Sequence, residues 1–268
     1  MLDNKRFCGS SHGWIATVDD ANQHVITLIN PFKNVAPIVL PWLPIGMSLD
    51  RVVLSVDPLT KPNDYVVAAI HSCRCRLSLI RAGQEFWTYV QNTGVWYIDI
   101  TFYRGLVYAV CGPIGWKYRI VSFKLPYSSM EKIIPNVFYQ DSYLQGACLV
   151  KSLEGDLWMV TSFQVYKLEL DAQNGKVLQM LKLESLGDNV LFISDFGDST
   201  AASSFYFSNC LQKDLIYNAT NDYDDGSLFD LRVYNVKEGR FIKHDPPINP
   251  SVKNESPTLW ILPQFQWD

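Results

Sequence analysis

The chain has 268 residues, of which 48% are hydrophobic and 19% charged, so it can bury a large core and is too apolar to be disordered. Its formal net charge of -4 at pH 7 disfavours a nucleic-acid partner, which usually requires a basic patch. The sequence contains no run of about 18 apolar residues, so we expect no membrane-spanning helix.

A pair of β-strand patterns recurs along the chain at intervals of about 40–60 residues, close to the ~40–50 of known propeller repeats. The first strand of each pair is short and apolar, and the second alternates apolar and polar residues, which is typical of a half-buried strand. First strands are expected at residues 13–15, 65–67, 106–108, 157–159, 215–217 and 259–261, and second strands at 24–30, 76–81, 119–125, 165–170 and 231–236. These pairs predict an all-β, kelch-like β-propeller that forms a single domain over residues 1–268.

The predicted propeller has five complete four-stranded blades, each with an apolar inner strand, the two pattern strands and an outer strand. In the third blade these strands are expected at 99–102, 106–111, 119–125 and 131–134. The apolar strand at 259–261 predicts a partial sixth blade, because no second strand follows it before Asp268. The ring would then be two strands short and would expose unpaired strand edges.

The six cysteines are scattered through strand-like segments of a chain too large to need disulfide bonds for its stability. The first ten residues, MLDNKRFCGS, also lack the apolar core of a secretory signal. We therefore expect reduced, mostly buried thiols in an intracellular protein of the cytoplasm or nucleus. The cysteines are Cys8, Cys73, Cys75, Cys111, Cys148 and Cys210.

Residues 9–13, GSSHG, match the G-x-S-x-G pattern of a hydrolase nucleophile. In hydrolases that serine lies on a turn from a strand into a helix, whereas a strand is expected after Gly13 here. We therefore interpret the segment as a turn, with Ser11 and His12 in structural roles, and expect no catalytic residue.

Two segments carry possible metal ligands. His71, Cys73 and Cys75 alternate, so on one strand they would share a face and could bind zinc, but no second pair of ligands accompanies them. Residues 221–226, NDYDDG, resemble the start of a calcium loop, yet its twelfth position, where a bidentate acid is needed, is Arg232. The sequence thus predicts no metal site and no cofactor.

A binding surface is expected where loops gather at one end of the blades, because loops on a rigid scaffold carry recognition. Tryptophan, tyrosine and arginine dominate the energetics of protein interfaces. The candidate anchors lie near proline- or glycine-containing connections and are Trp42, Trp96, Tyr97, Trp116 and Tyr118.

Several segments, in order along the whole chain, resemble the plant KIB-type β-propeller family, whose propeller often follows an F-box. They include residues 8–14 (CGSSHGW), 28–32, 38–41, 53–55, 66–70, 86–88, 99–102 with Gly105, 108–110, 185–188 and 257–263. At residues 207–210 the chain has FSNC where the family tends to have a proline-glycine-cysteine turn.

The resemblance implies a non-catalytic, protein-binding propeller similar to the substrate-recognition domain of plant F-box proteins in Skp-cullin ubiquitin ligases. The family's F-box lies upstream and is absent from these residues, so Skp-cullin binding is not expected of any residue here. An alternative is a hydrolase or carbohydrate-acting propeller with its site at the central channel. Acidic or histidine side chains that converge on the channel would favour that alternative.

Overall fold

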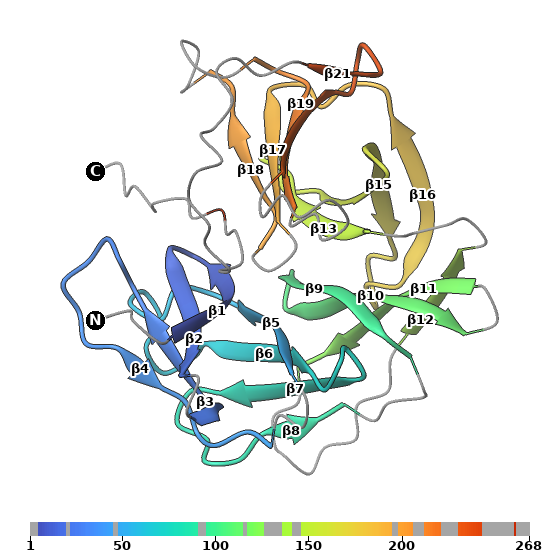
Figure 1. Ribbon diagram of the computed structural model, residues 1–268. Helices are drawn as coiled ribbons and strands as arrows, with labels where there is room; N and C mark the ends of the chain where they lie inside the picture. Colours follow the sequence, from blue (N-terminus) through green and yellow to red (C-terminus); the bar gives the residue numbers. More distant parts are fainter. Residues whose placement is uncertain are drawn as a thin grey trace.

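The computed structural model describes residues 5–19, 22–44, 48–90, 95–114, 117–125, 136–140, 146–194, 198–205, 212–220, 230–242 and 260. Within these residues the strands form five sheets, and no residue is helical. We number the sheets as blades 1 to 5 in chain order. Their inner strands surround a common axis (Figure 1).

Blades 1 to 4 each contain four antiparallel strands. Blade 1 has β1 (Lys5–Ser11), β2 (Trp14–Asp19), β3 (Asn22–Ile29) and β4 (Ile38–Val39). Blade 2 has β5 (Leu49–Leu54), β6 (Val66–His71), β7 (Arg76–Arg81) and β8 (Thr88–Tyr89). Blade 3 has β9 (Tyr97–Tyr103), β10 (Leu106–Ile114), β11 (Lys117–Lys124) and β12 (Asn136–Gln140). Blade 4 has β13 (Cys148–Lys151), β14 (Leu157–Thr161), β15 (Gln164–Leu170) and β16 (Val177–Leu183).

Blade 5 departs from this pattern because it has five strands in the order β18-β17-β19-β20-β21. These strands are β17 (Asn189–Ser194), β18 (Thr200–Ser203), β19 (Leu215–Thr220), β20 (Asp230–Asn235) and β21 (Arg240–Ile242). β17 and β18 form an antiparallel hairpin, and β19 runs parallel to β17. β17 therefore lies as an additional strand between β18, at the edge of the sheet, and β19.

The predicted strand pairs are confirmed in all five blades. They correspond to β2–β3, β6–β7, β10–β11, β14–β15 and β19–β20, each an antiparallel pair. The outer strand of blade 3 is Asn136–Gln140, whereas the predicted strand at 131–134 lies outside the described residues.

The partial sixth blade is not seen in the part of the chain that the structure describes. Residues 259 and 261 lie outside that part, and Trp260 between them is not in a strand. Trp260 instead packs against blade 5, where its ring meets Phe192 edge-on at a centroid distance of 5.0 Å. One sheet with an added hairpin strand therefore occupies the place next to blade 1.

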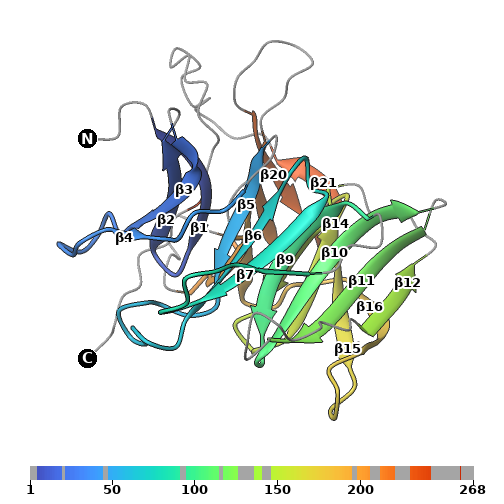
Figure 2. The same ribbon diagram turned by 90° about the horizontal axis from the view of Figure 1, so that it is seen from below.

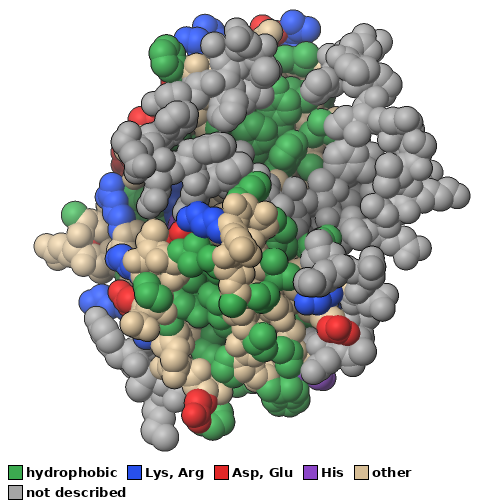
Figure 3. Space-filling view, turned by 90° about the vertical axis from the view of Figure 1, so that its left-hand side faces the viewer, with side chains coloured by type: hydrophobic (Ala, Val, Ile, Leu, Met, Phe, Trp, Pro, Cys, Tyr) green, Lys and Arg blue, Asp and Glu red, His purple; other side chains and the backbone are tan. Residues whose placement is uncertain are grey.

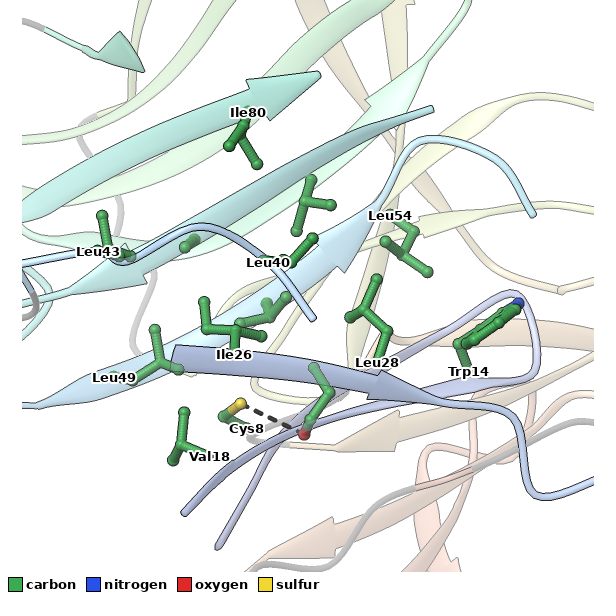
Figure 4. Close-up of a cluster of buried hydrophobic side chains, with 14 of the residues drawn as sticks. Cys8, Trp14, Val18, Ile26, Leu28, Leu40, Leu43, Leu49, Leu54 and Ile80 are labelled. Carbon is green, nitrogen blue, oxygen red and sulfur yellow. Dashed lines mark hydrogen bonds between the residues drawn. The ribbon is translucent and has the colours of Figure 1, made fainter. Parts of the chain in front are cut away.

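The hydrophobic core lies between neighbouring blades, as five clusters of buried side chains. Between blades 1 and 2, Ile26 and Leu28 of β3 and Cys8 of β1 face Leu49 and Leu54 of β5 (Figure 4). The Cys8 thiol donates a hydrogen bond to the Ala16 carbonyl oxygen at 3.3 Å. Burial raises the pKa of the Cys8 thiol to about 12, so it behaves as an apolar core residue.

Trp14 joins blade 1 to blade 2 by a buried hydrogen bond. Its indole Nε1 donates to Asp57 Oδ1 at 2.8 Å, and the same oxygen accepts a bond from the Leu59 amide at 2.9 Å. The Asp57 carbonyl accepts further bonds from the amides of Thr60 and Lys61, both at 3.1 Å. The glycine-tryptophan pair at the start of β2 therefore fixes the long connection between β5 and β6.

The strand order gives the propeller two opposite ends. We call the end at which inner strands β1, β5, β9 and β13 finish the end face; it carries turns 12–13, 55–65, 104–105, 152–156 and 171–176. We call the opposite end the start face; it carries turns 40–44, 72–75, 95–96 and 162–163. In Figure 2 the strands of blades 3 and 4 overlap in projection; the two blades contact each other through β9 and β10 with β13 and through β12 with β16.

Candidate functional site

A buried ion pair connects the inner strands of four blades at the axis. The Arg51 guanidinium of β5 donates to a carboxylate oxygen of Asp99 on β9, and its second terminal nitrogen donates to the Ser194 carbonyl oxygen of β17 at 3.0 Å. The other Asp99 oxygen accepts a hydrogen bond from the Leu149 amide of β13 at 2.6 Å. Arg51 is 5% and Asp99 1% exposed, so water cannot screen this interaction.

Opposing effects act on the Asp99 carboxyl. Desolvation raises its pKa, while the Arg51 guanidinium and the amides of Leu149 and Ile100 favour the ionised form. Arg51 lies on β5, Ile100 on β9 and Leu149 on β13, so the carboxylate holds blades 2, 3 and 4 in register. The arrangement is that of a structural ion pair.

A second network connects blade 5 to blade 1. The Ser11 hydroxyl donates to Asp198 Oδ2, and the Asp198 amide donates to the Ser10 carbonyl oxygen at 2.9 Å. Ser10 Oγ donates to the Trp260 carbonyl oxygen at 2.8 Å, and the Trp260 indole donates to the Ile193 carbonyl oxygen at 2.8 Å. These hydrogen bonds join the first and last described blades around the axis.

Residues 10 and 11 thus serve to close the ring, which explains the serines in the segment resembling a nucleophile. Ser11 Oγ also accepts a bond from the Leu54 amide at 3.1 Å, so a strand amide and a carboxylate hold it directly. In a catalytic triad a histidine would lie between serine and acid. His12 instead occupies the β1–β2 turn with a φ of 52°, and burial and the nearby Lys151 charge lower its pKa to about 4.

The raised pKa of the Asp198 carboxyl leads us to expect a specific pH dependence of stability. Burial raises its pKa to about 7 against the opposing charges of Lys151 and Arg51 and the Ser11 hydrogen bond, and the Asp99 charge raises it further. The folded-state pKa exceeds that of an unfolded aspartate, about 4. The contribution of this group to the free energy of unfolding is therefore complete below pH ~4 and declines as the pH rises to ~7.

We therefore expect the free energy of unfolding of the wild-type protein to fall, relative to that of Asp198→Asn, between about pH 4 and 7 and to stay parallel above pH 7. Urea unfolding of both proteins at half-unit pH intervals measures this difference, and effects of other titrating groups cancel. A difference that is constant from pH 4 to 8 would show that Asp198 titrates normally.

The end face carries a groove built from two adjoining cavities of about 500 and 640 Å³. The smaller lies between blades 3 and 4, and the larger reaches from blade 2 to Lys151 near the axis. Arg81, Arg104, Gly105 and Leu125 line both cavities. We call this continuous depression the end-face groove; its charged lining residues are Lys61, Asp64, Arg81, Arg104, Lys124, Lys151, Glu154 and Asp171.

The predicted aromatic anchors lie in different environments. Trp42 and Trp96 are 58% and 61% exposed, and both lie on the start face, where Trp42 packs on the His24 ring at 5.1 Å. Tyr97 is buried, because it begins β9 and its ring packs between blades 2 and 3. Trp116 and the side chain of Tyr118 lie outside the described residues. A binding role for Trp42 and Trp96 stays a prediction.

Other hydrophobic side chains accompany Trp42 on blade 1. Phe32, Val35 and Val39 are exposed there, and the view onto this blade shows hydrophobic side chains gathered over it, mainly in its lower half (Figure 3).

The geometry separates the possible zinc ligands. β6 ends at His71, whose ring is buried and hydrogen bonded to Ser78 Oγ at 2.9 Å and Ser72 Oγ at 3.1 Å. Cys73 lies exposed in the following turn, where Ser72, Cys73 and Arg74 all have positive φ, so the three possible ligands do not share a strand face. Within the described residues no group of metal-ligating side chains converges. The acidic segment 221–226 lies outside those residues.

The thiols also differ from one another. Cys8, Cys111 and Cys148 are buried as expected, whereas Cys73 is exposed and Cys75 partly exposed. Burial raises the pKa of Cys111 to about 12. Cys210 lies outside the described residues.

Among the residues that the structure describes, no helix is long and apolar enough to cross a membrane.

Sequence reasoning missed the axial residues Arg51, Asp99 and Lys151 and found no partner for Asp198. A signal was present, because Arg51 and Asp99 are charged residues within the largely apolar inner strands LDRVVL and YIDITFY. A charged residue in such a strand requires a partner when the strand is buried. The partners come from other blades, which the local pattern does not identify.

The family model of the KIB1-4 β-propeller matches residues 1–235 of this five-bladed chain. The chain belongs to the KIB1-4 β-propeller family. No curated protein matches this KIB propeller in sequence.

Solved structures resemble this KIB propeller in fold. The β-propeller domain of Cps50 (Swd1) from Myceliophteria thermophila matches with a TM-score of 0.51 at 9% identity, over 90% of this chain and 74% of that chain. A putative 6-phosphogluconolactonase from Bacteroides uniformis gives a TM-score of 0.43 at 12% identity, over 66% of this chain and 53% of the other. Hsv2 from Kluyvelomyces marxianus gives 0.42 at 12% identity, over 65% and 59%.

Proposed function

We propose that this KIB propeller is a non-catalytic protein-interaction module. The main support for this proposal is that both axial carboxylates accept hydrogen bonds from the protein itself. Asp99 accepts them from Arg51 and two strand amides, and Asp198 from Ser11. The axis is thereby used to hold the blades together, and the loops at the two ends remain for recognition. Membership in the KIB1-4 family supports the same role.

The finer form of the proposal is recognition of a protein that a Skp-cullin ubiquitin ligase modifies. In this arrangement an F-box supplied outside these residues would contact the ligase, and the propeller would contact the client. We further propose that the protein acts inside the cell, in the cytoplasm or nucleus, where ubiquitin ligases of this class work.

The convergence of acidic side chains at the axis is also the feature by which a hydrolase or carbohydrate-acting propeller would be recognised. It does not favour catalysis here, because the two carboxylates accept hydrogen bonds from the protein itself and Asp99 is 1% exposed. A general acid or base must reach the substrate within hydrogen-bond distance. The described axial residues leave Asp99 no such access.

Affinity purification of the full protein, quantified by mass spectrometry, tests the proposal. We expect specific recovery of a protein client, and recovery of Skp and cullin subunits with forms that contain an F-box. The client should be lost with Asp99→Ala, which destabilises the propeller, and retained with Glu238→Ala, a change on the exposed surface of blade 5. Turnover of a small-molecule substrate without any specific protein client would contradict the proposal.

A further inference from the structure

The acidic residues of the end-face groove are already engaged by neighbouring groups. Asp64 pairs with Arg81 at 2.7 Å. Both carboxylate oxygens of Glu154 accept bonds from Asn189 Nδ2 at 3.0 Å. Asp171 accepts bonds from the amides of Gln173 and Asn174 at 2.9 and 3.0 Å.

Four cations of the same groove have no carboxylate within ion-pair distance among the described residues. These are Lys61 on the β5–β6 connection, Arg104 on the β9–β10 turn, Lys124 at the end of β11 and Lys151 at the end of β13. Lys61, Arg104 and Lys124 are exposed, and Lys151 is partly buried toward the axis. The groove therefore presents excess positive charge on a chain whose net charge is -4, so its cations are concentrated at this place.

The β9–β10 turn holds Arg104 in a defined position. Arg104 and Gly105 have φ values of 49° and 75°, the two positive angles of a type I′ turn, in which asparagine normally precedes glycine. The guanidinium lies over the Tyr103 ring at 5.0 Å, and one of its nitrogens is 3.4 Å from the Gly155 carbonyl oxygen. The Tyr103 hydroxyl donates to the same carbonyl at 2.5 Å.

An arginine at this turn position carries a backbone cost that asparagine or glycine would avoid. The ring contact beneath its guanidinium limits the loss of side-chain entropy on binding, and arginine recognises carboxylates through a planar fork of donors. These features suit recognition of an anionic group at the centre of the groove.

The groove also has apolar walls. Val56, Val66 and Phe102 line the larger cavity, and Leu106 and Leu170 line the smaller one. The groove extends across blades 2, 3 and 4, so its shape suits an extended peptide better than one small anion. We propose that the end-face groove binds an acidic peptide segment of a partner protein, with carboxylates at Arg104 and Lys124 and apolar side chains against these walls; this rests on the proposed binding function.

Fluorescence anisotropy with the full protein tests the proposal. The probes are three labelled 12-residue peptides of equal hydrophobic content, in which the variable positions are Asp/Glu, Asn/Gln or Lys. We expect saturable binding of the acidic peptide alone, weakened by raising the salt concentration from about 0.05 to 0.5 M because the charges are exposed. Inorganic phosphate at the same concentration as the acidic peptide should not displace that peptide, since it lacks the apolar contacts.

Arg104→Glu and Lys124→Glu should each weaken binding of the acidic peptide at least about tenfold, because a like charge replaces an opposite one. Lys237→Glu is the matched control: it makes the same charge change at an exposed position of the β20–β21 turn that does not line the groove, and it should leave affinity unchanged. All three positions are exposed, so circular dichroism and thermal unfolding should match the wild type.

Equal affinity for the acidic and neutral peptides, displacement by phosphate, or unchanged binding by Arg104→Glu would overturn the proposal. These failures are distinct from failure of the interaction role. A protein client recovered equally by wild type and Arg104→Glu would leave the interaction module intact and place its contact elsewhere, whereas the absence of any client contradicts the module itself.

Discussion

Replacing Asp99 by alanine is expected to lower the free energy of unfolding by about 3–5 kcal/mol, because it leaves the Arg51 guanidinium buried without its carboxylate. Arg51 is 5% exposed and cannot reach bulk water without opening the axis. The Leu149 amide loses its acceptor as well. Urea unfolding followed by tryptophan fluorescence measures the change, since the chain has eight tryptophans.

Two comparisons separate the ion pair from a general effect of substitution. Glu238→Ala removes the carboxylate of an exposed ion pair, Arg240–Glu238 at 2.7 Å, and should cost less than about 1 kcal/mol. The double variant Arg51→Met, Asp99→Leu removes both charges and should recover much of the stability lost in Asp99→Ala. Equal losses for Asp99→Ala and Glu238→Ala would contradict the structural role of the axial pair.

Gly9→Ala is the second substitution with a large expected effect, a loss of about 3 kcal/mol from overpacking. A Cβ at Gly9 would lie 2.1 Å from the Val52 carbonyl oxygen, so the backbones of β1 and β5 would have to separate. That separation would disturb neighbouring Ser10 and Ser11, which join blade 5 to blade 1. Thermal and urea unfolding should both show the loss.

Gly112→Ala provides the matched control for Gly9. Gly112 lies in β10, and a Cβ there would meet the Trp96 Cβ at 3.5 Å, an ordinary contact. The chemical change is identical, and the expected effect is within about 1 kcal/mol, because alanine fits without displacement and lowers the conformational entropy of the unfolded chain. Similar losses at both positions would show that close approach of the inner strands is not what requires Gly9.

The sequence identified the pattern strands with their limits correct to within a few residues. The apolar runs at 106–108 and 157–159 lie within β10 and β14, and the alternating segments at 76–81 and 165–170 coincide with β7 and lie within β15. This success has a local cause, since side chains on a strand alternate between two faces and each face meets a different environment.

The expectations that were wrong concern how strands combine. Blade 5 gained β18 because Thr200–Ser203 turns back on β17, and a short strand of that kind carries little alternation. Tyr97, a candidate anchor near a connection, is buried at the start of β9, because the apolar alternation of that strand extends two residues before Asp99. A polar residue near the end of a strand can be exposed in a loop or can bond a buried partner. The packing of the neighbouring blade determines which of the two occurs.

The sequence by itself determined the fold class and the strand pairs, because alternation and turn residues act within about ten residues of chain, and its resemblance to KIB-type propellers indicated the family. The tertiary structure alone decided which polar groups meet: Arg51 with Asp99 across 48 residues, Arg51 with Ser194 across 143, and Ser11 with Asp198 across 187. These partners follow from the curvature that brings five inner strands to one axis. The end-face groove arises in the same way, because its cations come from turns of different blades.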